Sequence, residues 1–310
     1  MKRSLVGCAA VLLIGVSASA FAAESESAEV LSVCLNKDNP PFSLSKEGSV
    51  GGFDYAVASA VATALGKKLD VKWYEKERRS RGPVSVKTSV LINGGICQLV
   101  GGYPLIQSSL DRPNGESTTL PPVDGLSAES RTQRIDGSQL LASSPYYFAG
   151  FTVVLGPTVP VQKLSSLDEL VPYKIGGRPA GMGDLIAMAY KKGLLSKNAV
   201  HTAVQIEPLD ALAKSEFDVT LVESHKFDIY RQENPAAPLR PSGLYLPVGL
   251  NLGFVSTAKH SALLAAVSGA VDALLKSGEI ENIARKSGLT FITPQIPPVR
   301  SGLGLDQLIR

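Results

Sequence analysis

The sequence predicts an α/β protein that contains two α/β units, and three observations lead to this prediction. Apolar strand-like segments alternate with amphipathic helical patterns from residue 30 to residue 103, and a second alternation follows between residues 147 and 224. Strands that alternate with helices are typical of parallel sheets with right-handed crossovers. The 310 residues also suffice for one large domain or for two medium-sized lobes.

The first 22 residues have the features of a secretory signal peptide. Two basic residues precede the apolar run Val6–Val16, which is too short to span a bilayer, and Ala20–Ala22 has the small-residue pattern of a cleavage site. The segment Leu5–Cys8 resembles a lipoprotein cleavage box, but it precedes most of the apolar run, so lipidation is the weaker interpretation. The sequence therefore predicts a periplasmic protein from which residues 1–22 are removed.

Charge and composition argue against several functional classes. Removing the two basic residues of the signal peptide lowers the formal charge from +3 to +1, which gives no indication of nucleic-acid binding. His201, His225 and His260 are scattered, without the spacing or the cysteine partners of a metal site. No nucleophile elbow is present, and Glu223 alone does not make a case for acid–base catalysis. We therefore expect a monomer without cofactor, metal or enzymatic activity.

The first α/β unit is predicted from its periodicity. Ala56, Val57, Ala60 and Val61 recur at helical spacing, and short β-branched or aromatic segments lie on either side of this helix. The predicted elements, in order, are a strand at 30–35, a helix at 54–65, a strand at 69–74, a helix at 84–93 and a strand at 96–103. In a parallel sheet of this kind the first strand is central, between the second and the third.

Two cysteines remain after signal-peptide cleavage, Cys34 in the first predicted strand and Cys97 in the third. An oxidising compartment favours a disulfide, whereas two buried thiols are the alternative. Neighbouring strands lie roughly 4.8 Å apart, which is within the Cα separation that a disulfide accepts. We therefore predict a Cys34–Cys97 bridge across adjacent strands.

Residues 107–139 form a long segment that is rich in Ser, Pro, Gly and charged residues and lacks periodicity. We predict a surface insertion. It is either a mobile loop without a function or a lid or partner-binding segment, and the sequence leaves both alternatives open.

The second α/β unit begins with the aromatic cluster at Tyr146–Phe148, which leads into a strand. A Gly-rich turn precedes a helix around Leu185. Further strands are predicted at 173–177, 202–207, 218–224 and 246–257, with a helix at 208–217. Two helices follow residue 260, and a Pro/Gly-rich tail is expected to lie on the surface.

Three motifs resemble the type 2 periplasmic solute-binding proteins, in particular the family 3 group typical of amino-acid transporters. They are "NPPFS" at Asn39–Ser43, "GGFD" at Gly51–Asp54 and "SPYYFAGFTVV" at Ser144–Val154. The resemblance implies two α/β lobes with a ligand cleft between them, a small polar solute as ligand and an inner-membrane ABC permease as partner. It implies lobe 1 at 29–147 with the insertion at 107–139, lobe 2 at 148–248, and a return to lobe 1 with the C-terminal tail at 249–310.

A narrower resemblance rests on "VCLNKDNPPFS" together with "NGGICQLVGGYP". These segments are similar to binding-protein homologues encoded beside quinoprotein alcohol dehydrogenases, including the J-type accessory proteins of methanol oxidation. The chain departs from that group after Arg79 and in the insertion after Tyr103. The alternative function is a non-transport accessory protein that binds a periplasmic PQQ-dependent dehydrogenase, through the insertion and the basic segment at 77–81.

The family resemblance also implies a set of ligand-binding residues. Family 3 amino-acid binders hold the ligand carboxylate with an arginine after the third strand, but the nearest arginine here, Arg112, lies in the insertion. Aromatic residues are expected to wall the cleft, a Gly-rich helix start to attract anions, and Glu223 to face an ammonium or to pair with Lys226. The candidate residues are Phe42, Asp54, Tyr103, Tyr147, Arg178, Ala180, Gly181, Met182 and Glu223.

Overall fold

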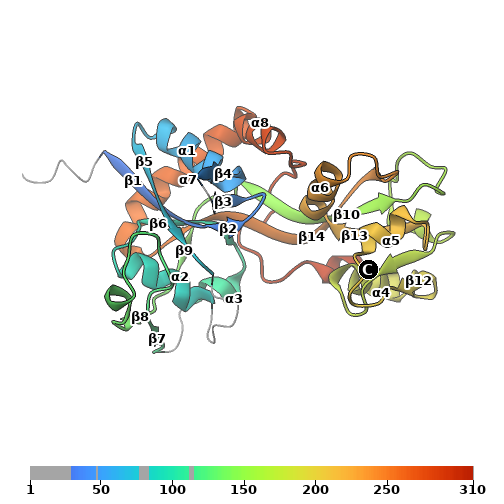
Figure 1. The fold of residues 1–310 in the computed structure, drawn as a ribbon, viewed down its shortest axis with the longest axis horizontal. Coiled ribbons are helices and arrows are strands. Elements are labelled where there is room, and N and C mark those ends of the chain that lie inside the picture. Colours follow the sequence, from blue (N-terminus) through green and yellow to red (C-terminus); the bar gives the residue numbers. More distant parts are fainter. Residues whose placement is uncertain (1–28, 47, 77–83, 112–114, 310) are drawn as a thin grey trace, which may run out of the picture.

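The computed structural model describes residues 29–46, 48–76, 84–111 and 115–309. The predicted signal peptide and the basic segment at 77–81 lie outside the described residues. Two lobes are joined by long strands, as Figure 1 shows. We call them lobe 1 and lobe 2. Lobe 1 contains β1 (Val30–Asn36), β5 (Lys68–Tyr74) and β6 (Leu99–Pro104), and lobe 2 contains β11 (Ile175–Gly177), β12 (Ala199–His201) and β13 (Val219–Glu223). The predicted two-lobed α/β fold is therefore confirmed.

Lobe 1 is built on three parallel strands with β1 in the centre, as the sequence predicts. Val33 of β1 lies opposite Val71 of β5 on one side and Leu99 of β6 on the other. The elements are β1 (Val30–Asn36), β2 (Asp38–Asn39), β3 (Ser43–Lys46), β4 (Ser49–Gly51), α1 (Phe53–Ala64), β5 (Lys68–Tyr74), α2 (Val84–Asn93) and β6 (Leu99–Pro104). Strands β2, β3 and β4 form a small separate antiparallel sheet beyond the end of β1.

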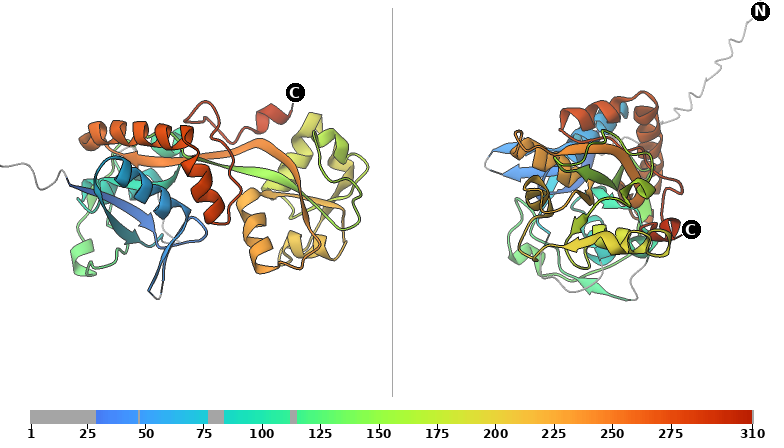
Figure 2. Two further views of the ribbon diagram at one scale, coloured as in Figure 1. Left: turned by 90° about the horizontal axis from the view of Figure 1, so that it is seen from above. Right: turned by 90° about the vertical axis from the view of Figure 1, so that its right-hand side faces the viewer.

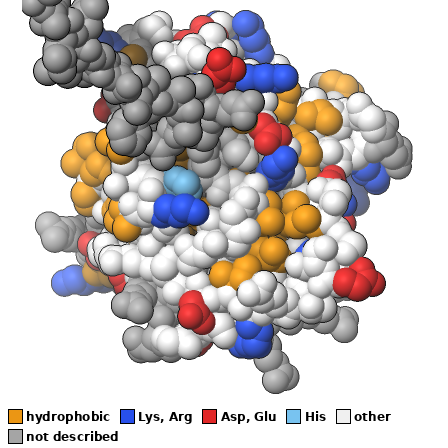
Figure 3. All heavy atoms as spheres, turned by 90° about the vertical axis from the view of Figure 1, so that its left-hand side faces the viewer, with side chains coloured by type: hydrophobic (Ala, Val, Ile, Leu, Met, Phe, Trp, Pro, Cys, Tyr) orange, Lys and Arg blue, Asp and Glu red, His pale blue; other side chains and the backbone are white. Residues whose placement is uncertain are grey.

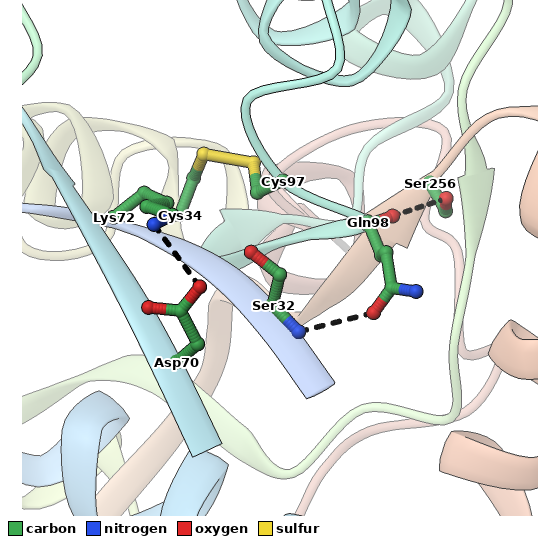
Figure 4. Close-up of a disulfide and its surroundings, with 7 residues drawn as sticks. All are labelled: Ser32, Cys34, Asp70, Lys72, Cys97, Gln98 and Ser256. Carbon is green, nitrogen blue, oxygen red and sulfur yellow. Dashed lines mark hydrogen bonds and ion pairs between the residues drawn. A yellow bond between two sulfur atoms is a disulfide. The ribbon is translucent and has the colours of Figure 1, made fainter. Parts of the chain in front are cut away.

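A disulfide joins Cys34 to Cys97 with a Cα–Cα distance of 5.7 Å, which confirms the predicted bridge (Figure 4). Cys97 lies in the turn before β6 rather than inside the strand, which begins at Leu99. The turn is held against β1 because the backbone N–H of Gln98 donates to the Ser32 carbonyl at 3.0 Å. The Ser32 backbone N–H in turn donates to the Gln98 side chain at 3.0 Å.

The insertion packs against lobe 1 on the side of α2. Its apolar side chains Leu110, Leu120 and Val123 are buried in one cluster with Val90 and Leu91 of α2. The chain near Val123 also lies alongside the end of β5, because the Glu75 N–H donates to the Pro122 carbonyl at 2.9 Å. Its elements are α3 (Gln107–Leu110), β7 (Ser117–Thr118) and β8 (Ile135–Asp136), and β9 (Leu141–Ala142) follows it.

Lobe 2 contains a second set of strands and helices. They are β10 (Tyr147–Leu155), β11 (Ile175–Gly177), α4 (Met182–Ala189), β12 (Ala199–His201), α5 (Pro208–Ala213), β13 (Val219–Glu223), α6 (Ser224–Glu233) and β14 (Arg240–Ser256). The strand predicted at 202–207 is wrong: β12 ends at His201, and the chain turns where the Ile206 N–H donates to the Ala203 carbonyl. Val204 is exposed because this turn leaves the sheet.

One mixed sheet runs through both lobes in the order β12-β11-β13-β10-β14-β6-β1-β5. Strand β14, 17 residues long, pairs with β10 and then with β6, where Leu252 lies opposite Pro104. Strands β10 and β14 therefore carry the chain between the lobes, as the view from above shows in Figure 2.

The C-terminal helices α7 (Ser261–Lys276) and α8 (Glu279–Lys286) return to lobe 1. Leu264, Val267 and Ile283 share a buried cluster with Val57 and Val61 of α1. Within the described residues, the segment 258–276 is also long and apolar enough to cross a membrane, with a hydropathy of 1.2. Its apolar ridge packs on α1, and 22% of this window is buried inside the structure.

The tail after α8 was expected on the surface, but it crosses to lobe 2. Asn251 of β14 fixes it by donating to the Gln295 carbonyl at 2.7 Å. A short 3-10 helix at Leu305–Leu308 then ends the described chain, and Leu308 is buried in a lobe 2 cluster with Leu246 and Val248. The tail is thus a third connection between the lobes.

On the face of lobe 1 in Figure 3, acidic and basic side chains are interspersed.

Candidate functional site

A cavity of about 1210 Å³ opens where the parallel strands of lobe 1 end. Loops that leave the carboxyl ends of neighbouring strands diverge and so leave a crevice at this edge of the sheet. The wall comes from the loop after β1, the β3 hairpin, the end of β5, α2, β6 and the insertion. Every described residue of the wall belongs to lobe 1 or its insertion.

Asp54 contributes a buried carboxyl group to this wall. Its side chain at the start of α1 is 1% exposed and accepts a hydrogen bond of 2.8 Å from the Tyr146 hydroxyl. Burial raises the pKa of Asp54 to about 7, although the Tyr146 hydrogen bond opposes this shift. Asp54 therefore titrates near neutral pH.

Gly102 explains how this carboxyl group fits behind the strand. Its backbone has a φ of 65°, and its N–H donates to the Tyr146 hydroxyl at 2.7 Å. A Cβ at this position would collide with the Asp54 carboxyl group. Glycine is therefore required both for the left-handed backbone and for the close approach of Asp54.

Two tyrosines complete this side of the cavity. The Tyr103 hydroxyl donates to the carbonyl of Ser109 in α3 at 2.5 Å, which ties β6 to the insertion. Burial raises the pKa of the Tyr103 phenol well above its usual value and that of Tyr74 to about 12. Both phenols are therefore neutral hydrogen-bonding groups at physiological pH.

Phe42 and Tyr147 lie at the junction of the two lobes instead of in the cavity wall. The Phe42 ring packs edge-on against Tyr147 at 5.8 Å and against His225 of α6 at 5.2 Å between centroids. Tyr147 is fully buried, and its hydroxyl donates to the Thr290 carbonyl of the tail at 3.2 Å. In this structure both aromatic residues are core residues that hold lobe 2 against lobe 1.

The Gly-rich turn before α4 is separate from the cavity. Gly181 and Met182 begin the helix, but the Ala180 N–H donates to the carboxylate of Asp184 at 2.9 Å. Arg178 pairs with Glu207 of the same lobe at 2.8 Å. The turn thus already holds a carboxylate of its own, and its role as a ligand site stays a prediction.

Glu223 is the last residue of β13, and its carboxylate forms an ion pair of 2.9 Å with Lys226. This ion pair is the alternative to a ligand role that the sequence left open. The structure therefore brings Asp54 and Tyr103 together at the cavity, and Phe42 and Tyr147 at the lobe junction. Glu223 and the turn before α4 do not line the cavity, and Glu223 lies two residues before His225, which packs on Phe42. Their roles in ligand binding stay predictions.

Sequence reasoning missed the lysines and the threonines of the cavity wall. Lys37 directly follows β1 and Lys76 lies two residues after β5, so their position at strand ends was a usable signal. Thr118 and Thr119 lie in the aperiodic insertion, where no local pattern indicates their position. Among the described residues no group of three or more His, Cys, Asp or Glu side chains could hold a metal ion.

Solved structures show the same fold at low sequence identity. The unliganded, open L-cystine solute receptor of Neisseria gonorrhoeae has a TM-score of 0.60 and 17% identity, over 87% of this chain and 97% of its own. The second substrate-binding domain of GlnP from Lactococcus lactis, in an open conformation, has a TM-score of 0.59 and 14% identity, over 84% and 95%.

An ancestral cyclohexadienyl dehydratase is also similar, with a TM-score of 0.56 and 17% identity over 84% of this chain and 93% of its own. No family model matches the sequence, and no curated protein sequence matches it significantly. The likeness therefore concerns the architecture, in which two α/β lobes share one mixed sheet. The chain has the fold of the two-lobed solute-binding proteins.

Proposed function

We propose that this chain is an exported, monomeric solute-binding protein of the ABC-transporter type. It holds a small polar ligand in the lobe 1 cavity and presents it to an inner-membrane permease. The observation that carries the proposal is the polar cavity at the carboxyl edge of the lobe 1 sheet, in a two-lobed fold. The neighbours described as an L-cystine receptor and as a substrate-binding domain support it by their fold.

Closure of lobe 2 over the cavity would complete the site. Strands β10 and β14 form the connection about which such a hinge motion takes place in this proposal. Glu223, Arg178 and the turn at 180–182 are the lobe 2 groups that we propose to reach the ligand in the closed state. To do so, Arg178 must leave Glu207, and Glu223 must leave Lys226.

Binding without catalysis is the proposed activity, although a dehydratase shares the fold. A hydrolytic or acyl-transfer site needs a nucleophile next to a general base. In the described wall, the titratable groups near Asp54 are neutral tyrosines, and no histidine or cysteine lines the cavity. The wall therefore favours ligand binding.

Native mass spectrometry of the protein from its own periplasm tests this function. We expect the monomer to carry a small molecule, and we expect S45W to release it because Ser45 lines the cavity. The matched control T63W places the same side chain on the exposed part of α1, away from the cavity, and is expected to keep the ligand. A monomer that is empty and binds no small solute would refute the proposal.

The dehydrogenase-associated alternative rests on one structural observation. The Cys34–Cys97 disulfide joins the two segments that resemble that group. In this alternative the outer side of the insertion contacts a periplasmic quinoprotein dehydrogenase. The same native spectra distinguish the two functions, because an empty cavity together with a large bound partner would favour the accessory role over transport.

A further inference from the structure

Charged side chains of both signs line the cavity, and most of the charge is positive. The lysines come from four places: Lys37 after β1, Lys46 at the end of β3, Lys76 after β5 and Lys87 on α2. The acids in the described wall are Asp38, Asp54 and Glu75. The contacts of each side chain decide which of these charges are compensated by a charge of the opposite sign.

Within the described part of the chain, Lys37 is the one lysine of this set with an ion pair. Its Nζ lies 2.6 Å from Glu75 and 3.1 Å from Asp124 of the insertion. These three side chains therefore form a closed group at the rim. One ammonium faces two carboxylates in this group, so the group keeps a net charge of −1 and Glu75 is only partly compensated.

Asp54 also carries less than a full charge near neutral pH. It is buried behind Gly102, and the hydrogen bond that it accepts comes from Tyr146, a neutral group. Burial raises the pKa of its carboxyl group to about 7. Asp38, exposed in β2, is the third acid of the described wall, and it has an interaction partner of its own.

Three further lysines, Lys46, Lys76 and Lys87, line the described wall. Lys87 is half-buried on α2, and in the described part of the chain it makes no ion pair or side-chain hydrogen bond. Lys46 and Lys76 are exposed at the mouth and likewise have no partner there. The four lysines outnumber the three acids of the described wall, and a cleft with an excess of one sign of charge concentrates ligands of the opposite sign.

The origin of these lysines in different elements favours a ligand with more than one anionic group. An ammonium acts as a point charge, whereas the guanidinium of an arginine grips one carboxylate with two hydrogen bonds. No arginine occurs in the described wall, and the three lysines belong to different elements. At about 1210 Å³, the cavity also exceeds the usual range of about 300–1,000 Å³ for small-molecule pockets.

We propose that the cavity binds a small organic anion that carries at least two separated carboxylate or phosphate groups. Lys87 contacts one anionic group inside the cavity, and Lys46 and Lys76 attract the other at the mouth. The hydroxyls of Thr88, Thr118 and Thr119 in the same wall are available to its polar groups. This inference rests on the proposed solute-binding function and specifies its ligand class.

Titration calorimetry with chosen probes tests the ligand class. Citrate represents the carboxylates, glucose 1,6-bisphosphate the phosphates, and glucose and arginine are the neutral and cationic controls. We expect citrate or the sugar phosphate to bind more tightly than both controls, with an affinity that falls as the salt concentration rises. Whichever anion binds identifies the type of anionic group.

A pair of variants localises the binding. K87Q is expected to weaken the anion about tenfold or more, as loss of a charge-assisted hydrogen bond does. K276Q, at the exposed end of α7, removes the same charge far from the cavity and is expected to change nothing. Equal affinity of K87Q and the unmodified protein for the anion would overturn the assignment.

The result also separates this inference from the proposed function. If neither anion binds, or if glucose or arginine binds more tightly, the anionic class is wrong. A small molecule retained in the native mass spectra would in that case leave solute binding intact. Loss of both the retained molecule and the anion binding would remove the function and the inference together.

Discussion

Three residues from different parts of the chain form one hydrogen-bonded unit at the cavity. The Gly102 N–H donates to the Tyr146 hydroxyl, and this hydroxyl donates to Asp54. A carboxyl group that is buried with a neutral partner prefers its protonated form, because burial penalises the charge and no cation offsets it. The unit therefore makes stability depend on pH.

We expect stability to fall as pH rises through the pKa of Asp54. This pKa is raised from 3.8 to about 7, so the folded state keeps a proton that the unfolded chain releases between these values. The stabilisation by the proton on Asp54 is complete below pH 3.8 and is lost above pH 7. This loss lowers the free energy of unfolding by at most about 4 kcal/mol. Urea unfolding at pH 4, 6 and 8 measures it.

The variant D54N provides the comparison, because an amide does not titrate. We expect D54N to lose less stability than the unmodified protein between pH 4 and pH 8. D70N, which removes an exposed carboxylate paired with Lys72, serves as the control and is expected to keep the original pH dependence. Parallel pH profiles for D54N and the unmodified protein would contradict a buried, titrating Asp54.

At the scale of elements, the insertion is part of the cavity wall. Leu120 is buried next to α2, and its neighbours Thr119 and Pro121 face the cavity. The Asp124 N–H donates to the Trp73 carbonyl at 2.9 Å, so this part of the insertion lies alongside the end of β5. The alternative of a mobile loop therefore does not hold for the described residues that line the cavity.

L120A is expected to loosen this wall. Truncation of a buried leucine destabilises a protein by about 2–5 kcal/mol, and here it also frees the residues on either side. We expect lower stability in urea and a lower occupancy of the small molecule in native mass spectra. L140A is the matched control, because Leu140 is buried in the same cluster but does not line the cavity. Equal ligand loss in both variants would show that the insertion acts only through stability.

Across the whole molecule, two strands and the tail join lobes that have separate cores. The disulfide lies within the lobe 1 core, whereas the buried clusters of lobe 2 contain Val219, Leu221 and Phe217. Gln232 of α6 donates to the Gly288 carbonyl at 2.9 Å, and the Thr290 N–H donates to Asp228 at 2.7 Å. Helix α6 is thereby held to the segment after α8.

Removal of the disulfide is expected to destabilise lobe 1 selectively. The bridge closes a sequence separation of 63 residues, and in the chain-entropy model such a loop contributes roughly 4 kcal/mol. In the double variant C34S/C97S, we expect hydrogen exchange to accelerate in β1, β5 and β6 while β11 and β13 keep their protection. Equal acceleration in both lobes would show that they unfold as a single unit.

Local patterns in the sequence were sufficient for much of the fold. The helical repeat around Val57 and Val61 predicted α1, and the apolar segments beside it predicted β1 and β5, because burial of one face imposes a period on the chain. The disulfide followed from the predicted strand order and compartment. Helix α6 was not predicted, since Ser224–Glu233 is mostly polar and has few apolar side chains.

The sequence by itself determined the α/β alternation, the strand order of lobe 1 and the pairing of Cys34 with Cys97. These features depend on periodicity, on handedness and on which strands are neighbours. Only the tertiary structure decided that Phe42 meets His225, that the insertion forms part of the cavity wall, and that lysines from different elements line one cavity. Such contacts join residues far apart in the chain, and no local pattern encodes a distance between them.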